Sequence, residues 1–172
     1  MAGAGADHLT PGVALPAIAL PATVGAEVSI AALTGRSVVA IYPWTGRPGH
    51  PNPPDWDDIP GAHGSTPELE GFRDLYQRFA QEGAKVLALS RQTSAWQREL
   101  TARLRLPFPI LSDEDGRFAE ALALPSFVTG GTIYLKRLTL VVREGRIETV
   151  FYPVANPADH AADVLAWVEA QA

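Results

Sequence analysis

Two short sequences, YPWT at residues 42–45 and GAHGSTPE at residues 61–68, lie on either side of a proline-rich loop. The first ends an apolar run at residues 37–42, which predicts a strand buried on both faces. The second opens an amphipathic helix that we expect over residues 66–81. In α/β proteins, anions and reactive groups collect where the carboxyl end of a strand faces a helix N-terminus. The surroundings therefore predict a nucleophile at position 65, where the sequence has Ser65.

The composition is that of a folded domain with an acidic surface. The 172 residues are 47% hydrophobic and 19% charged, which fits one globular domain spanning residues 1–172. The net charge of −5 and a pI near 5.3 argue against nucleic acid or an anionic membrane as a partner. The chain has no cysteine, which excludes disulfides, thiolate metal sites and a thiol redox cycle carried by this chain. Nothing in the sequence points to a metal or an organic cofactor.

The stretch at residues 9–26 carries no charge, so a leader or a membrane span has to be considered. Pro11, Pro16 and Pro21 interrupt it, and no lysine or arginine precedes it. A signal peptide has a basic start and an unbroken apolar region, and a spanning helix needs about 20 apolar residues. We therefore expect a cytoplasmic protein.

The order of the predicted elements indicates an α/β fold. They are strands at 17–20, 28–30 and 37–42, a proline-rich loop at 46–64, a helix at 66–81, a strand at 85–89, a helix at 93–104, a strand at 108–111, a helix capped by Ser112 and ending at Leu122, a hairpin of strands at 138–142 and 146–152, and a helix from Asn156-Pro157. Alternating strands and helices followed by a late hairpin predict a mixed central sheet with helices on both faces.

Several of these residues together resemble a known motif. Pro43, the sequence GSTPE at 64–68, FRD at 72–74 and Arg137 at the start of RLTLVV are similar to Pro-x-x-x-Thr-x-x-Cys-x-x-Glu with an arginine entering a late hairpin. The chain thus resembles a peroxiredoxin of the alkyl hydroperoxide reductase and thiol-specific antioxidant family, in its bacterioferritin-comigratory branch, over residues 15–167. The resemblance implies a thioredoxin-like fold of the peroxiredoxin type, a hydroperoxide or other small-molecule ligand, and a homodimer.

The chain departs from that family's pattern in four places. The peroxidatic cysteine falls on Ser65, and the motif threonine falls on Ala62. Residues 46–63 form a long insertion that separates Pro43 from the rest of the motif. The resolving cysteine of this branch, five residues after the peroxidatic one, would fall on Glu70.

The loss of sulfur has a severe chemical consequence. A peroxidase thiol reacts as the thiolate, whose pKa of about 8.5 is lowered by a helix N-terminus and a nearby cation. The resemblance implies that Arg137 supplies that cation. A serine hydroxyl is far less acidic and cannot pass through a sulfenic acid. Although the family activity is a thiol-dependent peroxidase, we expect no thiol-peroxidase turnover from this chain.

The predicted site has two groups of residues. The resemblance places one group at the position of the chemistry, namely Ser65, Arg137, Glu68 and Pro43. The other group is expected to contact the substrate, and consists of Thr45, His63 and Trp44. Trp44 and Trp56 would flank the entrance, where an indole can stack on a flat ligand or simply pack the loop.

Other interpretations compete for the same residues. Ser65 and Glu68 have the spacing of a capping box, which we take as the present role of Ser65. Arg137 lies either in the pocket or on the surface beside Lys136. His63 could act as a base toward Ser65, although the sequence lacks the Gly-x-Ser-x-Gly of a nucleophile elbow.

The remaining histidines and the acidic residues of the loop suggest little further chemistry. His50, His63 and the nearby aspartates 55, 57 and 58 gather in the loop, but their spacing does not support a metal site. His8 and His160 are expected to be solvated.

Three functional hypotheses follow. In the first, the chain has lost the thiol and now binds or senses a ligand through the Arg137 pocket. In the second, it is an active one-cysteine peroxidase in which serine replaces the cysteine, and the codon at position 65 of the encoding gene tests this. In the third, Ser65 and His63 act on an electrophilic small molecule. Because Ala62 also departs from the motif, a single replacement does not explain the sequence, which favours the first hypothesis.

Overall fold

The computed structural model describes residues 4–171 and has a mixed five-stranded sheet at its centre. The strand order is β5 (Ile110–Ser112), β4 (Ala84–Ser90), β3 (Arg36–Ile41), β8 (Leu138–Arg143) and β9 (Arg146–Phe151). Strands β3, β4 and β5 are parallel, whereas β8 runs antiparallel to both β3 and β9. The predicted mixed sheet with a late hairpin is confirmed.

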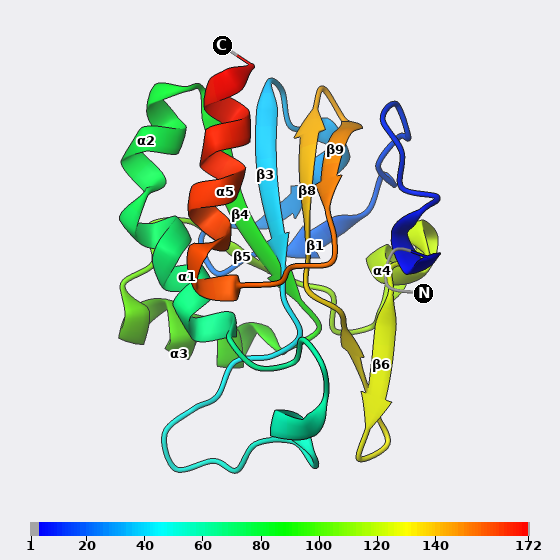
Figure 1. Ribbon diagram of the computed structural model, residues 1–172, viewed down its shortest axis with the longest axis vertical. Helices are drawn as coiled ribbons and strands as arrows, with labels where there is room; N and C mark the ends of the chain where they lie inside the picture. Colours follow the sequence, from blue (N-terminus) through cyan, green and yellow to red (C-terminus); the bar gives the residue numbers. More distant parts are fainter. Residues whose placement is uncertain (1–3, 172) are drawn as a thin grey trace.

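Helices cover both faces of this sheet, as predicted (Figure 1). One face packs against α1 (Ser65–Asp74), α2 (Tyr76–Gln81), α3 (Ser94–Leu104) and α5 (Pro157–Ala170). The other packs against α4 (Arg117–Leu122) and the N-terminal hairpin of β1 (Ala19–Pro21) and β2 (Glu27–Ser29). Short 3-10 turns lie at Ala4–Ala6 and Ile30–Ala32.

Strand β3 shows why the sequence is apolar at every position. Val38 and Ala40 belong to the core on the α1 side, whereas Val39 and Ile41 belong to the core on the α4 side. Successive side chains of a strand point to opposite faces, so a central strand covered on both sides needs apolar residues throughout. Because β3 is buried on both faces, the position of residues 42–45, which follow it, is fixed as well.

The proline-rich loop is held against a third hairpin, which the sequence did not predict. The hairpin consists of β6 (Ser126–Thr129) and β7 (Thr132–Leu135), and the loop contains one 3-10 turn at Trp56–Asp58. Trp56 is buried, with its ring centroid 5.7 Å from that of Phe127 and 5.1 Å from that of Tyr134. The Thr129 hydroxyl donates to the Pro54 carbonyl at 2.6 Å. The hairpin escapes sequence patterning because its strands are short and Val128 and Ile133 are exposed.

Two local predictions are wrong. The helix predicted over residues 66–81 is interrupted at Leu75, which has φ −99° and ψ 4° and separates α1 from α2. Ser112 does not cap the following helix, because it ends β5 and its hydroxyl donates to the Gln92 carbonyl. Instead, the carboxylate of Asp113 accepts hydrogen bonds from two backbone N–H groups at the start of α4. A carboxylate binds such N–H groups more strongly than a hydroxyl does.

Within residues 4–171, no helix combines the length and the apolar character that crossing a membrane requires.

Gly64 joins the start of α1 to the start of α5, and its replacement tests this contact. Gly64 has φ 114°, and a Cβ built on it would lie 2.9 Å from Cγ of Pro157. We expect Gly64→Ala to destabilise the fold by about 2–4 kcal/mol, because strain and overlap add. Gly61→Ala is the matched control: φ is 80° there and a Cβ meets no atom within 4 Å. Its expected cost is about 1 kcal/mol. Equal losses in urea unfolding would show that the contact with Pro157 does not matter.

Candidate functional site

Ser65 and Arg137 meet in a buried corner of the molecule. Ser65 is the first residue of α1 and is 3% exposed, and Arg137 lies between β7 and β8 and is 4% exposed. The Arg137 Nη1 group donates a hydrogen bond to the Ser65 Oγ atom at 3.0 Å. Of the two locations considered for Arg137, the structure therefore shows the pocket. The fold brings the predicted nucleophile position and the predicted cation into direct contact.

Glu68 completes this corner from the same helix. It follows Ser65 by three residues, so the two side chains lie on the same side of α1. Its Oε1 atom accepts a hydrogen bond from Arg137 Nη1 at 2.8 Å, and its side chain is fully buried. The capping-box interpretation is wrong: Gly64 is the N-cap, and no side chain caps the helix. Glu68 is a partner of Arg137 instead.

The second amino group of Arg137 holds the end of the proline-rich loop. Arg137 Nη2 donates to the carbonyl oxygens of Gly61, Ala62 and His63 at 3.3, 3.1 and 3.3 Å. Ala62, which stands at the position of the motif threonine, is completely buried and contributes only its backbone. The guanidinium thus links three parts of the chain: the loop end, the start of α1 and the segment before β8.

Burial controls the charge of the groups behind this corner. Burial raises the pKa of Glu68 to about 7, against the opposing effect of the neighbouring Arg137 charge and hydrogen bond. The Glu68 Oε2 atom has no hydrogen-bond partner in the described chain and lies 4.0 Å from Nε2 of His160. Burial also lowers the pKa of His160 to about 4, while Asp163 raises it and Arg137 lowers it. At neutral pH His160 is therefore uncharged, and its contact with Glu68 is not an ion pair.

His160 was expected to be solvated, and that expectation is wrong. It is 4% exposed, and its Nε2 atom lies 2.8 Å from the Thr139 hydroxyl. A sequence signal was available, because His160 precedes Val164 by four residues and Val164 belongs to the buried stripe of α5. His8, in contrast, lies at the surface as expected.

The predicted substrate-contacting residues gather around Ser65, and of these His63 contacts Arg137 through its backbone carbonyl. Trp44, Thr45 and His63 line a hollow of about 260 Å³ together with Ser65. The Thr45 hydroxyl, however, donates to Gln92 Oε1 at 3.1 Å, a partner that sequence reasoning missed. Arg137 lines a different hollow of about 510 Å³, with Lys136 and Tyr152. Among the described residues, only His63 lines both hollows, so Ser65 and Arg137 open to different sides.

The structure does not form the hydrolytic pair of Ser65 and His63. The His63 side chain is 78% exposed, and its Nδ1 atom lies 3.4 Å from a carboxylate oxygen of Asp57. The Ser65 hydroxyl contacts Arg137 and makes no hydrogen bond with the imidazole. Pro43 is buried directly after β3 and lines neither the hollow beside Ser65 nor the hollow beside Arg137. Among residues 4–171, no three His, Asp or Glu side chains are grouped to hold a metal ion.

Known proteins share both the sequence pattern and this fold. Residues 10–165 match the profile of the family described as Redoxin. The chloroplastic peroxiredoxin Q of Oryza sativa subsp. japonica is 27% identical over 154 residues, covering 90% of this chain but 64% of that relative. The chain therefore spans less than two thirds of that relative's length.

Solved structures cover nearly the whole chain. The bacterioferritin comigratory protein of Xanthomonas campestris, studied for its alkyl peroxide reduction activity, has a TM-score of 0.75 and 26% identity, over 94% of this chain and 99% of its own. A cysteine-to-serine mutant of Xanthomonas campestris peroxiredoxin Q has a TM-score of 0.75 and 25% identity, with the same coverage of both chains.

The buried His160 predicts a specific pH dependence of stability. As the pH falls, the unfolded chain takes up a proton at the ordinary histidine pKa of 6.5, whereas the folded chain does so only near 4. The unfolded state binds more protons between these values, so His160 lowers stability as the pH falls. Glu68 has the opposite effect, because its folded pKa of about 7 lies above 4.5 and the folded state holds the extra proton.

Replacement of the histidine separates the two effects. When the pH is lowered from 7 to 4.5, the wild type should lose about 2–3 kcal/mol more unfolding free energy than His160→Gln does. The Glu68 effect cancels in this comparison, because Glu68 is present in both proteins. Urea unfolding at both pH values measures this difference, with His8→Gln at an exposed histidine as the control. A difference between wild type and His160→Gln that does not change with pH would contradict the assignment.

Proposed function

Because the chain belongs to the redoxin family and is a peroxiredoxin of the bacterioferritin-comigratory type, we propose that it is a cysteine-free homologue that binds a small hydroperoxide or anion without reducing it. The observation that carries this proposal is the contact between Arg137 Nη1 and Ser65 Oγ at 3.0 Å. The reactive corner is assembled, but its central atom is an oxygen.

The chemistry of that corner depends on the atom at position 65. A thiolate there would accept a charge-assisted hydrogen bond from Arg137 and would attack the outer oxygen of a hydroperoxide. The O–O bond would break, an alcohol would leave after taking up a proton, and the sulfur would become a sulfenic acid. The Ser65 hydroxyl keeps its proton at neutral pH and has no comparable oxidised state. The contact between residue 65 and Arg137 is therefore kept, whereas the atom that would carry out the reaction is missing.

The hollow beside Arg137 has the charge expected for an anion site. Lys136 and Arg137 both line it, and none of the lining residues in the described part of the chain carries a carboxylate. His63 and the hydroxyl-bearing Tyr152 add polar groups at its wall. A volume of about 510 Å³ accommodates a small ligand. Positive potential in a concave site attracts small anions, and hydrogen-bond donors suit the oxygens of a hydroperoxide.

An active one-cysteine peroxidase in which serine replaces the cysteine is the second candidate. The cysteine-to-serine mutant of Xanthomonas campestris peroxiredoxin Q keeps the fold that this chain has, with a TM-score of 0.75. A cysteine codon at position 65 of the encoding gene would favour this candidate, and a serine codon would exclude it.

Ser65→Cys tests whether the corner is intact. The wild type should consume no hydroperoxide, whereas the variant should turn over with dithiothreitol as the reductant and have a thiol pKa below about 8.5. A coupled assay with tert-butyl hydroperoxide measures the rate. The double change Ser65→Cys with Arg137→Met should lower that rate by about 100-fold, because it removes the cation. Steady turnover by the wild type, or a folded but inactive Ser65→Cys variant, would contradict the proposal.

Lys136→Gln tests the ligand site without touching the corner. Inorganic phosphate should bind the wild type with a Kd on the order of 1 mM, and the variant about 3-fold more weakly. Chemical-shift titration by NMR measures both, and tert-butyl hydroperoxide should compete with phosphate if it occupies the same hollow. Lys85→Gln is the control, because Lys85 lies outside this hollow and donates to the Thr34 carbonyl. Equal weakening by both variants would indicate general electrostatics rather than a site.

A further inference from the structure

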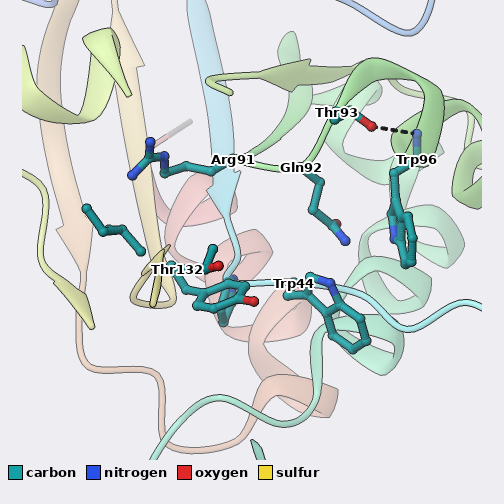
Figure 2. A pocket seen from close by; sticks show the side chains of 9 residues that line it. Trp44, Arg91, Gln92, Thr93, Trp96 and Thr132 are labelled. Carbon is teal, nitrogen blue, oxygen red and sulfur yellow. Dashed lines mark hydrogen bonds between the residues drawn. The ribbon is translucent and has the colours of Figure 1, made fainter. Parts of the chain in front are cut away.

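We propose that a second cleft, separate from the Ser65 and Arg137 hollows, binds a small aromatic carboxylate. The cleft has a volume of about 230 Å³ and lies between the end of β3, the start of α3 and strand β7 (Figure 2). Within residues 4–171, Trp44 alone lines both this cleft and the Ser65 hollow, and Arg137 lines neither of these two. The proposal therefore does not rest on the function proposed above.

The position of the cleft follows from the sheet topology. Strands β3 and β4 are parallel neighbours, so their carboxyl ends meet at the same edge. Pro43 and Trp44 follow β3, and Arg91 to Thr93 follow β4. Strand β7 supplies the opposite wall through residues 132–134. Ligands of open α/β sheets bind in the crevice beyond the carboxyl ends of such strands.

Aromatic rings form much of this cleft and are held in place before any ligand arrives. The Trp44 and Trp96 ring centroids are 6.0 Å apart with the planes at 38°, and Tyr134 lines the cleft from β7. Trp96 Nε1 donates to the Thr45 carbonyl at 3.0 Å, which fixes the orientation of that indole. Trp44 also packs against the buried Trp56, at 5.4 Å between centroids. Fixed indoles offer flat apolar surface for stacking at little cost in side-chain entropy.

Of the described residues that line the cleft, one is charged, and it is an arginine. Arg91 makes a single long hydrogen bond, from Nη2 to the Glu114 carbonyl at 3.4 Å. Its Nε–H is buried and has no hydrogen-bond partner in the described part of the chain. A guanidinium with unused donors binds a carboxylate in a planar, paired geometry.

The arrangement of these groups selects a ligand with two different ends. Figure 2 shows Arg91 on one side of Gln92, and Trp44 and Trp96 on the other. The Gln92 amide is already engaged, because it exchanges hydrogen bonds with Thr45. A ligand that satisfies both sides carries a flat ring toward the indoles and a carboxylate toward Arg91. An aromatic carboxylate is the smallest class with both features.

NMR titration with naphthoate tests the site directly. Naphthoate should bind with a Kd on the order of 0.1–1 mM and shift the indole N–H signals of Trp44 and Trp96. The Trp167 signal should stay unchanged, because this residue lies on α5, outside the cleft. Naphthamide keeps the ring without the charge, and cyclohexanecarboxylate keeps the charge without the ring. Each should bind at least about 5-fold more weakly than naphthoate.

Arg91→Gln assigns the charged end. The variant should weaken naphthoate binding about 10-fold and leave naphthamide binding unchanged. Arg98→Gln is the matched control, because Arg98 is an exposed arginine of α3 that does not line the cleft. Several results would overturn the proposal: no saturable naphthoate binding below about 10 mM, equal weakening by Arg91→Gln and Arg98→Gln, or unchanged Trp44 and Trp96 signals at saturation.

Discussion

The buried guanidinium of Arg137 is the constraint on which this structure depends. A charge removed from water is costly unless it is paired and hydrogen-bonded. Here the Glu68 carboxyl and the Ser65 hydroxyl accept hydrogen bonds from Nη1, and three carbonyl groups of residues 61–63 accept hydrogen bonds from Nη2, while the buried Nε has no partner in the described part of the chain. The end of the proline-rich loop, the start of α1 and the approach to β8 must therefore stay together. This requirement sets the shape of the candidate site.

The same network explains how the scaffold persists with serine at its centre. The Ser65 hydroxyl can accept the hydrogen bond that Arg137 offers, so folding does not need a sulfur atom at this position. Reactivity is different, because it depends on how easily the atom ionises and on whether it can be oxidised reversibly. Structure and chemistry thus place separate demands on residue 65. This chain meets the structural demand with an oxygen, and Glu68 and His160 behind it remain buried.

The proline-rich loop changes the surroundings of the corner more than the corner itself. Trp44 contacts both Trp56 and Trp96, and Trp56 packs against Tyr134, so these rings connect α3 to the β6–β7 hairpin. Aromatic packing of this kind gives a loop without regular structure a fixed position. It also divides the region beyond β3 and β4 into separate hollows, one beside Ser65 and one facing Arg91. The packing of the proline-rich loop therefore shapes the cleft at Arg91 as well as the hollow beside Ser65.

Sequence alone determined the central strands and the order of the main helices, because apolar periodicity is a local property, and its motif spacing predicted where a site would lie. It singled out Ser65, Glu68 and Arg137, which the fold brings into contact, and it shows that the chain has no cysteine. Only the tertiary structure decided that Ser65 binds Arg137 rather than capping α1, that His160 lies against the Thr139 hydroxyl, and that Thr45 binds Gln92. These contacts join residues far apart in the chain. Their partners depend on how sheet, loop and helices pack, which no local pattern records.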